Sequence, residues 1–345
     1  MSGRRDPVQQ RDDGSMDLQD IVNWRPESLP DRIIYRLYAV TRVAAPIVLV
    51  VFAVFILAVQ FVDGGLDALA DPLVATFVAL SAIPALVLAV YIWYADVTTG
   101  ESRRLLVVTF VLGFLFAGFA GILNVVAASW FIPQAFALGL GFEAVLATFF
   151  LLFVAPIEEC VKLLAVWVYA YRKPAFDAVI AGAVFGAMAG LGFATIENAL
   201  YITRYTDSAA GFSATLAQGT SITTQRALAG PGHVIYSAFA GYYLGLAKFN
   251  REYAGPIVVK GLLAAIFIHG WYNVLVSHVP DFLAATFGLS TVAALVMFIV
   301  AYDGLFAVLL GHKLSQYRNA YEQTHADEER IESELTEFDS GISER

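Results

Sequence analysis

The sequence predicts an all-α protein, a bundle of about eight helices that cross a membrane. Of the 345 residues, 59% are hydrophobic and 15% are charged, whereas about a quarter of the residues of a soluble globular chain are charged. The mean hydropathy is +0.68. Apolar stretches of about 20 residues, the length of a spanning helix, recur along the chain. We therefore expect a multi-pass protein of the cell membrane, in contact with lipid.

Eight stretches meet the requirements of a spanning helix, and most of the connections between them are short. They are 43–62, 73–95, 105–128, 143–171, 176–201, 231–247, 257–278 and 286–311. The fourth contains Pro156, which leaves two alternatives: one tilted, kinked helix, or a re-entrant piece over 143–154 followed by a helix that begins at Pro156. The segment 202–230, rich in Ser, Thr, Gly and Ala, is expected to be the longest loop.

Basic residues predict the orientation, because cytoplasmic loops carry an excess of Lys and Arg. With the N-terminus inside, the outer loops hold only Arg204 and Arg226, and 63–71 is purely acidic. The inner segments then hold Arg25, Arg32, Arg36, Arg42, Arg103, Arg104, Arg172, Lys173, Lys248, Arg251, Lys313 and Arg318. Both termini are therefore predicted to be cytoplasmic.

The same pattern divides the chain into three parts. Residues 1–32 form a cytoplasmic segment without a hydrophobic stretch, so no cleavable signal peptide is expected. Residues 33–312 form the transmembrane domain. Residues 313–345 form an acidic cytoplasmic tail, expected to be disordered because 322–345 holds nine acidic residues and two arginines.

Composition also excludes several classes of function. The one cysteine, Cys160, cannot form an intramolecular disulfide or a cysteine-based zinc cluster, and we expect it to pack in the bundle. The net charge is −9 and no basic patch is present, so no nucleic-acid partner is expected.

Ionisable residues inside spanning helices are candidate functional residues, because a charge in the bilayer core is unfavourable by at least a few kcal/mol. They are Glu158, Glu159, Lys162, Glu197, His233, His269 and Asp303, with Asn198 and Asn273 beside them. At a rise of 1.5 Å per residue, Glu158, His233 and His269 lie roughly 20 Å from the cytosolic ends of their helices. Glu197 lies about 30 Å from its end unless that helix tilts. Four helices thus bring polar groups to the outer half of the membrane.

Spacing adds detail to this cluster. Glu158 and Lys162 are separated by four residues and share a helix face, as do His269 and Asn273. Glu159 points about 100° away from Glu158, so the two carboxylates need not do the same work. Small residues recur over 182–194, which predicts close packing of that helix against its neighbours.

Two further polar residues are expected to be structural. Asn198 is predicted to hydrogen-bond between helices. Asp303 is predicted to pair with Lys260 or another partner in the inner half of the membrane.

The candidate residues occur in motifs that resemble the PrsW intramembrane proteases. The motifs are Glu158-Glu159-x-x-Lys162, Phe193-x-x-x-Glu197-Asn198, a histidine after Pro231-Gly232 (His233), and His269-x-x-x-Asn273, in this order on successive helices. The resemblance covers about residues 140–280, the expected catalytic core. More distantly, the pattern is similar to the CAAX prenyl endopeptidases and bacteriocin-processing proteases. Lys162 and Glu197 depart from that wider pattern, which has arginine and histidine there.

The resemblance implies roles for individual residues. Glu158 would act as the general base on a water molecule, and His269 and Asn273 would donate hydrogen bonds to the oxyanion. Glu197 would take the place of a water-holding histidine and could share a proton with Glu158. The alternative is a metalloenzyme, in which Glu158, Glu197, His233 and His269 bind zinc. The sequence leaves both mechanisms open.

The sequence therefore predicts an intramembrane endopeptidase. The resemblance implies a membrane-protein substrate, such as an anti-sigma factor or another single-pass protein. The alternative function is a proton-coupled transporter or channel, since buried Glu, Lys and His residues also serve as proton relays. That function predicts inverted repeats, and none is visible in the sequence.

Overall fold

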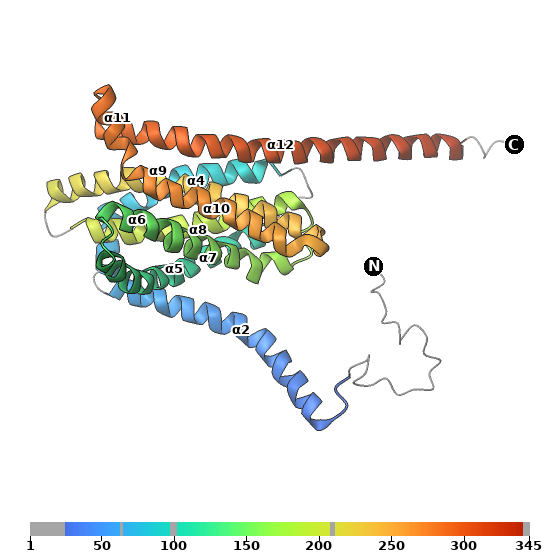
Figure 1. Cartoon of the computed structure of the whole chain (residues 1–345). Helices are drawn as coiled ribbons and strands as arrows, with labels where there is room; N and C mark the ends of the chain where they lie inside the picture. Colours follow the sequence, from blue (N-terminus) through green and yellow to red (C-terminus); the bar gives the residue numbers. More distant parts are fainter. Residues whose placement is uncertain (1–24, 63–64, 97–101, 208–210, 341–345) are drawn as a thin grey trace. The chain divides into compact units, whose positions relative to one another are not determined.

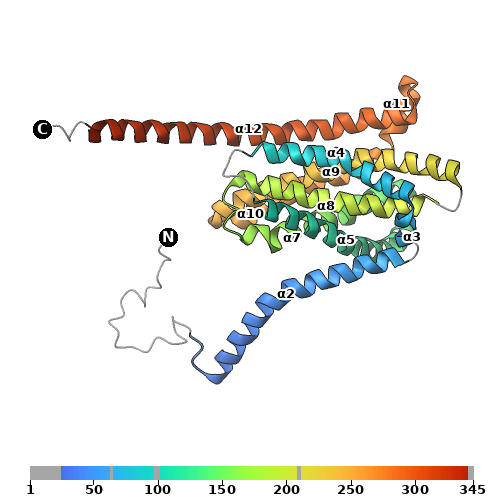
Figure 2. The same ribbon diagram turned by 180° about the vertical axis from the view of Figure 1, so that it is seen from behind.

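The computed structural model describes residues 25–62, 65–96, 102–207 and 211–340, and this part of the chain contains helices and no strand (Figures 1 and 2). The chain divides into two units at residue 52. Helix α2 (Leu29–Val62) begins in the first unit and ends in the second. The first 24 residues of the predicted N-terminal segment lie outside the described residues.

The second unit contains the remaining helices. They are α3 (Gly65–Ala70), α4 (Pro72–Tyr94), α5 (Arg103–Ala137), α6 (Phe142–Phe149), η1 (Phe150–Val154), α7 (Ala155–Val168), η2 (Ala170–Arg172), α8 (Val179–Tyr205), α9 (Phe212–Phe249), η4 (Arg251–Tyr253), α10 (Ala254–Val276), α11 (Val279–Phe287) and α12 (Thr291–Ser340). Seven helices or helical runs of the described residues are long and apolar enough to cross a membrane. The predicted all-α membrane fold is confirmed.

Helix α8 forms the centre of this unit and packs against α9, α5, α4 and α7. In its most apolar stretch 83% of the residues are buried, compared with 22% for α12. Glycine makes this packing possible, because a Cβ on Gly182, Gly186 or Gly190 would collide with a backbone oxygen of α9. A Cβ on Gly192 would collide with α5 in the same way. The close packing predicted for this helix is therefore confirmed.

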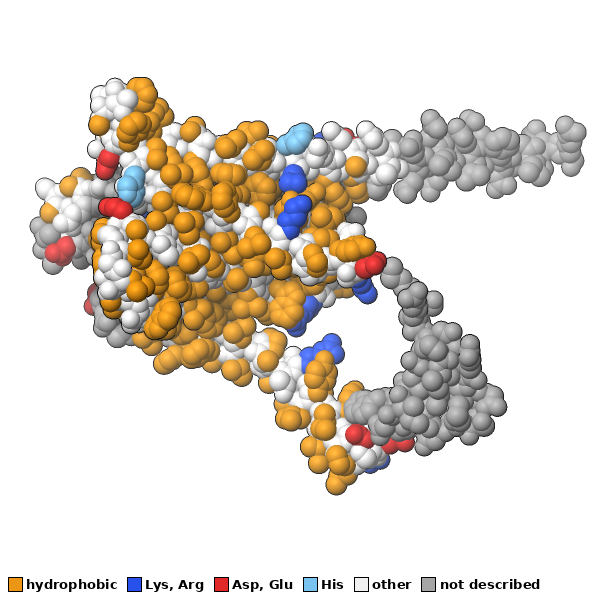
Figure 3. All heavy atoms as spheres, viewed as in Figure 1, with side chains coloured by type: hydrophobic (Ala, Val, Ile, Leu, Met, Phe, Trp, Pro, Cys, Tyr) orange, Lys and Arg blue, Asp and Glu red, His pale blue; other side chains and the backbone are white. Residues whose placement is uncertain are grey.

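The outer surface of the bundle is apolar. Figure 3 shows hydrophobic side chains over much of the face formed by α10 and α12. Exposed examples are Val259, Leu263 and Phe267 on α10 and Val300, Leu305 and Val308 on α12. An apolar surface of this extent is expected where a protein contacts lipid.

The fourth predicted span is one helical run, so the kinked-helix alternative is the correct one. The α-helix α6 passes directly into the π-helical turn η1, and α7 follows with Pro156 in its first turn. Proline lacks an N–H and its ring crowds the carbonyl four residues earlier. The wider π turn just before Pro156 lets the chain continue without a break.

The prediction of a loop over 202–230 is wrong, because most of that segment is helical. Helix α9 begins at Phe212 and is 38 residues long, continuing through Pro231. Its Ser, Thr and Gly residues pack against protein instead of lipid: Thr215, Gly219 and Thr223 are buried. Contact with α4, α8 and α10 explains why α9 does not need the apolar composition of a lipid-facing span.

Helical structure extends into the predicted acidic tail. Helix α12 continues beyond the apolar part and ends at Ser340, so only 341–345 of that tail lie outside the described residues. Glu is a good helix former, and Arg318 and Glu322 form an ion pair at 2.7 Å across one turn.

Candidate active site

Four helices of the second unit place ionisable side chains together inside the bundle. Helix α7 contributes Glu158, Glu159 and Lys162. Glu197 comes from α8, His233 from α9 and His269 from α10. Five of the six are buried with exposed fractions of 6% or less, and the Glu197 side chain is 19% exposed. Charged groups at this depth need partners, since burying an unpaired charge is strongly unfavourable.

Glu159 and Lys162 form the centre of a network of short contacts. One carboxylate oxygen of Glu159, Oε1, accepts hydrogen bonds from Lys162 Nζ at 2.7 Å and from His269 Nδ1 at 2.8 Å. Lys162 Nζ also lies 2.9 Å from His233 Nδ1 and 4.3 Å from the centre of the Phe193 ring. The ammonium group is therefore shared between α7, α8 and α9.

Spacing predicted that Glu158 and Lys162 share a helix face, and they form an ion pair, although Glu159 makes the shorter contact. The two are 3.8 Å apart, a longer distance than that to Glu159. Lys162 leans toward His233 and Phe193, which brings Glu159, three residues earlier, closer to its ammonium group.

The same contacts assign the protons of both histidines. His269 Nδ1 faces a carboxylate oxygen of Glu159, so it carries the hydrogen and leaves a lone pair on Nε2. Lys162 can only donate, so His233 Nδ1 accepts and His233 Nε2 carries the hydrogen. That hydrogen points at Glu197 Oε2, 3.0 Å away.

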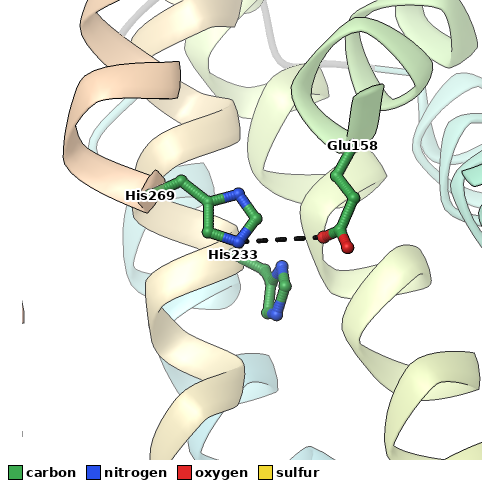
Figure 4. Close-up of side chains that lie close together, drawn as sticks. All are labelled: Glu158, His233 and His269. Atoms are coloured by element: carbon green, nitrogen blue, oxygen red, sulfur yellow. Dashed lines mark ion pairs between the residues drawn. The ribbon is translucent and has the colours of Figure 1, made fainter. Parts of the chain in front are cut away.

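Glu158 makes longer polar contacts than its neighbour Glu159, which like Glu158 has a buried Oε2 without a hydrogen-bond partner among the described residues. Its Oε1 accepts a hydrogen bond from Asn124 Nδ2 of α5 at 3.2 Å. Its Oε2 is buried and has no hydrogen-bond partner among the described residues. Figure 4 shows this carboxylate directed at the His269 ring, with Oε2 3.7 Å from Nε2, and the His233 ring lies beside them. Two groups that can both accept a hydrogen bond thus face each other in the interior.

Glu197 belongs to a second contact group. Arg226 Nη2 of α9 lies 2.6 Å from Glu197 Oε2, and Arg226 Nε donates to Asn198 Oδ1 at 2.9 Å. Glu197 contacts Arg226 and His233 and forms no hydrogen bond with Glu158 within the described structure. The shared proton expected for a Glu158–Glu197 pair therefore has no counterpart in this geometry.

Asn273 lies apart from these networks. It follows His269 by one turn of α10, as the spacing predicted, and is half-buried. No hydrogen bond of its side chain is found among the described residues. Its amide is therefore available as a donor or acceptor.

Sequence analysis missed two contacts of the site. Arg226 had been placed in an outer loop, and Asn124 had not been considered. Asn124 gave a usable signal, because it is an amide within an otherwise apolar spanning stretch. Nothing in the order of the residues, however, indicated that it would face Glu158.

The two residues expected to be structural have different outcomes. Asn198 links three helices, as predicted: Nδ2 lies 3.2 Å from Ser81 Oγ of α4 and 3.3 Å from the Arg226 carbonyl of α9. The pairing of Asp303 with Lys260 is wrong. Asp303 accepts a hydrogen bond from the Tyr236 hydroxyl at 2.7 Å, whereas Lys260 lies over the ring of Tyr243.

Comparison with known proteins connects this geometry to a family. The model of the PrsW family of intramembrane metalloproteases matches residues 101–303. The chain belongs to this family. The match extends beyond the expected core of 140–280 on both sides and includes Asn124 and Asp303.

Individual relatives agree. The chain is 29% identical to Protease PrsW of Shouchella clausii over 217 residues, which is 63% of this chain and 87% of the relative. It is 28% identical to Protease PrsW of Oceanobacillus iheyensis over 200 residues, 58% of this chain and 82% of the relative. With Protease PrsW of Geobacillus kaustophilus it shares 33% identity over 120 residues, 34% of this chain and about half (48%) of the relative. No solved structure matches the chain.

Membership in the PrsW family makes this protein a multi-pass membrane peptidase. It favours the protease interpretation of the buried cluster over the transporter. The resemblance first noticed in the motifs is therefore confirmed by the match over most of the membrane domain.

The donor set of this PrsW protein also fits a divalent metal. Ligand atoms of Glu158, His233 and His269 lie within 4.8 Å of one another, and all three residues are buried. One carboxylate and two imidazoles suit zinc, with water as a further ligand. Glu159 on His269 and Glu197 on His233 are the kind of outer carboxylates that orient metal-bound histidines. Glu197 itself is not a member of this group, because its carboxylate contacts Arg226 and His233.

Proposed function

We propose that this protein hydrolyses a peptide bond of a membrane-protein substrate with water activated at Glu158. One observation carries the proposal: Glu158 Oε2, which has no hydrogen-bond partner among the described residues, and the lone pair on His269 Nε2 face each other at 3.7 Å inside the bundle, with Lys162 Nζ 3.8 Å from the same oxygen. A water molecule has two hydrogens to donate, which matches two acceptors. This position suits a nucleophile that needs one proton removed.

The proposed reaction uses one proton acceptor. As the water oxygen attacks the scissile carbonyl carbon, Glu158 takes one of its protons and His269 Nε2 holds the other. The tetrahedral intermediate then collapses, the C–N bond breaks, and protonated Glu158 gives its proton to the departing amine. The products are a carboxylic acid, which keeps the second proton of the water, and a new amino terminus. Transfer of that proton from the acid to the amine gives a carboxylate and an ammonium group, so atoms and charges balance.

The oxyanion needs donors, and we assign this role to Asn273. Its half-buried amide lies one turn from His269 and has no hydrogen bond among the described residues. The resemblance assigned the same role to His269 as well. The tautomer that Glu159 imposes leaves His269 Nε2 without a hydrogen, so in this state it accepts instead of donating.

The remaining charged residues support these groups. Glu159 fixes the tautomer of His269, and Lys162 provides the positive charge that keeps Glu159 ionised in the interior. Glu197 and Arg226 fix His233 in the same way. Groups held in place before the reaction act without reorganisation, which is a large source of enzyme catalysis.

A metal would use the same residues. Glu158, His233 and His269 would hold it, and its chemistry there would be to acidify a bound water toward neutral pH. Lys162 Nζ lies 2.9 Å from His233 Nδ1, so this ammonium group would have to withdraw from that nitrogen. The two arrangements therefore differ in the position of Lys162.

For the substrate we propose a single-pass membrane protein, with membrane-bound anti-sigma factors as the class that the resemblance implies. The site lies between α7, α8, α9 and α10, and the predicted orientation puts it in the outer half of the membrane. The scissile bond would then lie near the outer end of the substrate's spanning helix.

The test is cleavage of tagged single-pass membrane proteins from the same host, co-expressed with this chain. Wild type is compared with Glu158→Gln, which keeps the size of the side chain and removes the proton acceptor. Glu143→Gln on α6 is the matched control, since Glu143 is exposed and pairs with His278, away from the buried cluster. Each purified variant is also assayed with a chelator, and again after zinc is restored.

We expect cleavage by wild type and by Glu143→Gln, and a loss of at least about 1,000-fold for Glu158→Gln, since general base and water position are lost together. Cleavage that survives Glu158→Gln would refute the proposed mechanism. Loss of activity with the chelator and recovery with zinc would establish the metal-bound form.

A further inference from the structure

Helix α12 makes two contacts with the surroundings of His269 through consecutive residues. The Tyr302 hydroxyl donates a hydrogen bond to the carbonyl of Ile268, the residue before His269, at 2.8 Å. Asp303 Oδ1 accepts the hydroxyl of Tyr236 at 2.7 Å. The Tyr236 ring in turn stacks on the His269 ring, with centroids 5.4 Å apart and planes inclined by 27°.

Asp303 is an unexpected residue at this place. It is 5% exposed on a helix that otherwise faces lipid and apolar side chains, and Lys260 does not pair with it. Its Oδ2 has no hydrogen-bond partner among the described residues. A buried carboxylate whose hydrogen bond comes from one tyrosine hydroxyl stabilises a fold poorly, because phenylalanine and an apolar residue would fill the same space without a desolvation penalty.

The hydrogen bond between Tyr236 and Asp303 fixes the orientation of the Tyr236 ring. With its hydroxyl fixed on α12 and its face on His269, the ring can rotate neither away from the imidazole nor into the site. His269 is then restrained at three points: Glu159 binds Nδ1, Tyr236 covers one face of the ring, and Tyr302 holds the backbone one residue earlier.

We propose that Tyr302 and Asp303 are positioning residues that align His269 with Glu158, which makes α12 part of the catalytic unit. This rests on the role proposed above for His269. Neither residue touches the reacting atoms. Their effect is to keep the lone pair of His269 Nε2 directed at the 3.7 Å gap in front of Glu158 Oε2.

The experiment measures kcat and KM for cleavage by Asp303→Leu, Asp303→Asn and Tyr236→Phe. Tyr242→Phe is the control, because Tyr242 also lies on α9 but its ring contacts Lys313 instead of the site. Asparagine retains an oxygen that can accept the Tyr236 hydroxyl, whereas leucine does not. If Asp303→Leu does not fold, Tyr302→Phe replaces it, since that change removes a single hydroxyl.

We expect kcat to fall about 10- to 100-fold for Asp303→Leu and Tyr236→Phe with KM nearly unchanged, as for other small misplacements of a catalytic group. Asp303→Asn should restore most of kcat. The double variant Asp303→Leu, Tyr236→Phe should lose no more kcat than either single variant, because both changes break the same hydrogen bond. Wild-type kcat in folded Asp303→Leu or Tyr302→Phe would overturn the proposal, as would equal losses for Asp303→Asn and Asp303→Leu.

Two measurements separate failure of this inference from failure of the proposed function. His269→Ala is assayed in parallel: if it cleaves normally, the function assigned to His269 is wrong, whereas an inactive His269→Ala beside a fully active Asp303→Leu refutes only the role of α12. Nitrogen NMR of labelled histidine follows the tautomer of His269 directly, with its signal identified by loss in His269→Ala. A changed His269 signal in Asp303→Leu supports positioning, and an unchanged signal contradicts it.

Discussion

The two halves of the site, which begin at neighbouring glutamates of α7, differ in the length of their polar contacts. On the Glu159 side, contacts of 2.7 to 2.9 Å join Oε1 of the carboxylate, Lys162 and the two histidines, and Glu159 is not exposed. On the Glu158 side, Asn124 donates a hydrogen bond at 3.2 Å, and His269 Nε2 and Lys162 Nζ lie 3.7 and 3.8 Å from Oε2. Oε2 of each glutamate has no hydrogen-bond partner among the described residues. The Glu159 side is therefore the more tightly held of the two, and the Glu158 side is the one on which we place the reaction.

The difference follows from helix geometry. Consecutive residues of an α-helix point about 100° apart, so Glu159 faces α9 and α10 while Glu158 faces α5 and the gap before His269. The short contacts of Glu159 and Lys162 hold the two histidines in the positions that the Glu158 side requires. The comparison predicts that substitutions on the Glu159 side mainly lower stability, whereas those on the Glu158 side mainly lower activity.

The largest effect on stability is expected for Lys162→Met. Methionine fills a similar volume but leaves the buried charge of Glu159 without its main partner, which costs about 3–5 kcal/mol. The free energy of unfolding in detergent micelles measures this. Lys260→Met is the control: Lys260 is exposed and lies over Tyr243, so a change of about 0.5 kcal/mol or less is expected. Equal losses for both variants would remove the distinction between the two sides.

A smaller loss of stability is expected for Arg226→Lys, a substitution in the contact group of Glu197. Arg226 contacts Glu197 and Asn198 with different nitrogens, and a lysine ammonium group cannot reproduce this fork. We expect a loss of stability of about 1.5–3 kcal/mol and a loss of activity of about tenfold, since His233 depends on Glu197. Arg204→Lys, an exposed change near the end of α8, should alter neither quantity. Retention of full activity by Arg226→Lys would show that His233 needs no such support.

The smallest effect is expected for Asn124→Ala on the Glu158 side. It removes one 3.2 Å hydrogen bond to the carboxylate and leaves the Glu159 network intact. We expect kcat to fall about five- to tenfold, corresponding to about 1 kcal/mol, with stability nearly unchanged. Gln134→Ala, an exposed amide change on the same helix, controls for effects on α5. A stability loss larger than the activity loss would contradict the assignment of this side to the reaction.

Sequence analysis predicted much of this site because a bilayer penalises every unpaired charge. Six of the seven predicted site residues form connected contacts, and the seventh, Asn273, lies one turn from His269. The i, i+4 spacing correctly placed Glu158 within ion-pair distance of Lys162, at 3.8 Å, but it did not show that Glu159 makes the shorter contact, at 2.7 Å. Local spacing therefore predicted which residues meet but not which atoms pair.

The errors have a common cause. The segment 212–230 was predicted to be a loop because its composition is too polar for a lipid-facing span, yet α9 packs against protein there. Asp303 was predicted to pair with Lys260 or another partner in the inner half of the membrane, and its hydrogen-bond partner is the uncharged Tyr236 hydroxyl. In both cases the surroundings of the residue, not its own type, determine the result.

The sequence by itself determined the membrane fold, the family and the polar residues of the site, because hydropathy and motif spacing are local properties. The tertiary structure alone decided which oxygen of Glu158 accepts a hydrogen bond from Asn124, and which residues support the site. Asn124 and Glu158 are 34 residues apart, Arg226 and Glu197 are 29 apart, and Tyr236 and Asp303 are 67 apart. Contacts at such separations depend on how closely whole helices pack, here on the glycines of α8, and no local pattern encodes that distance.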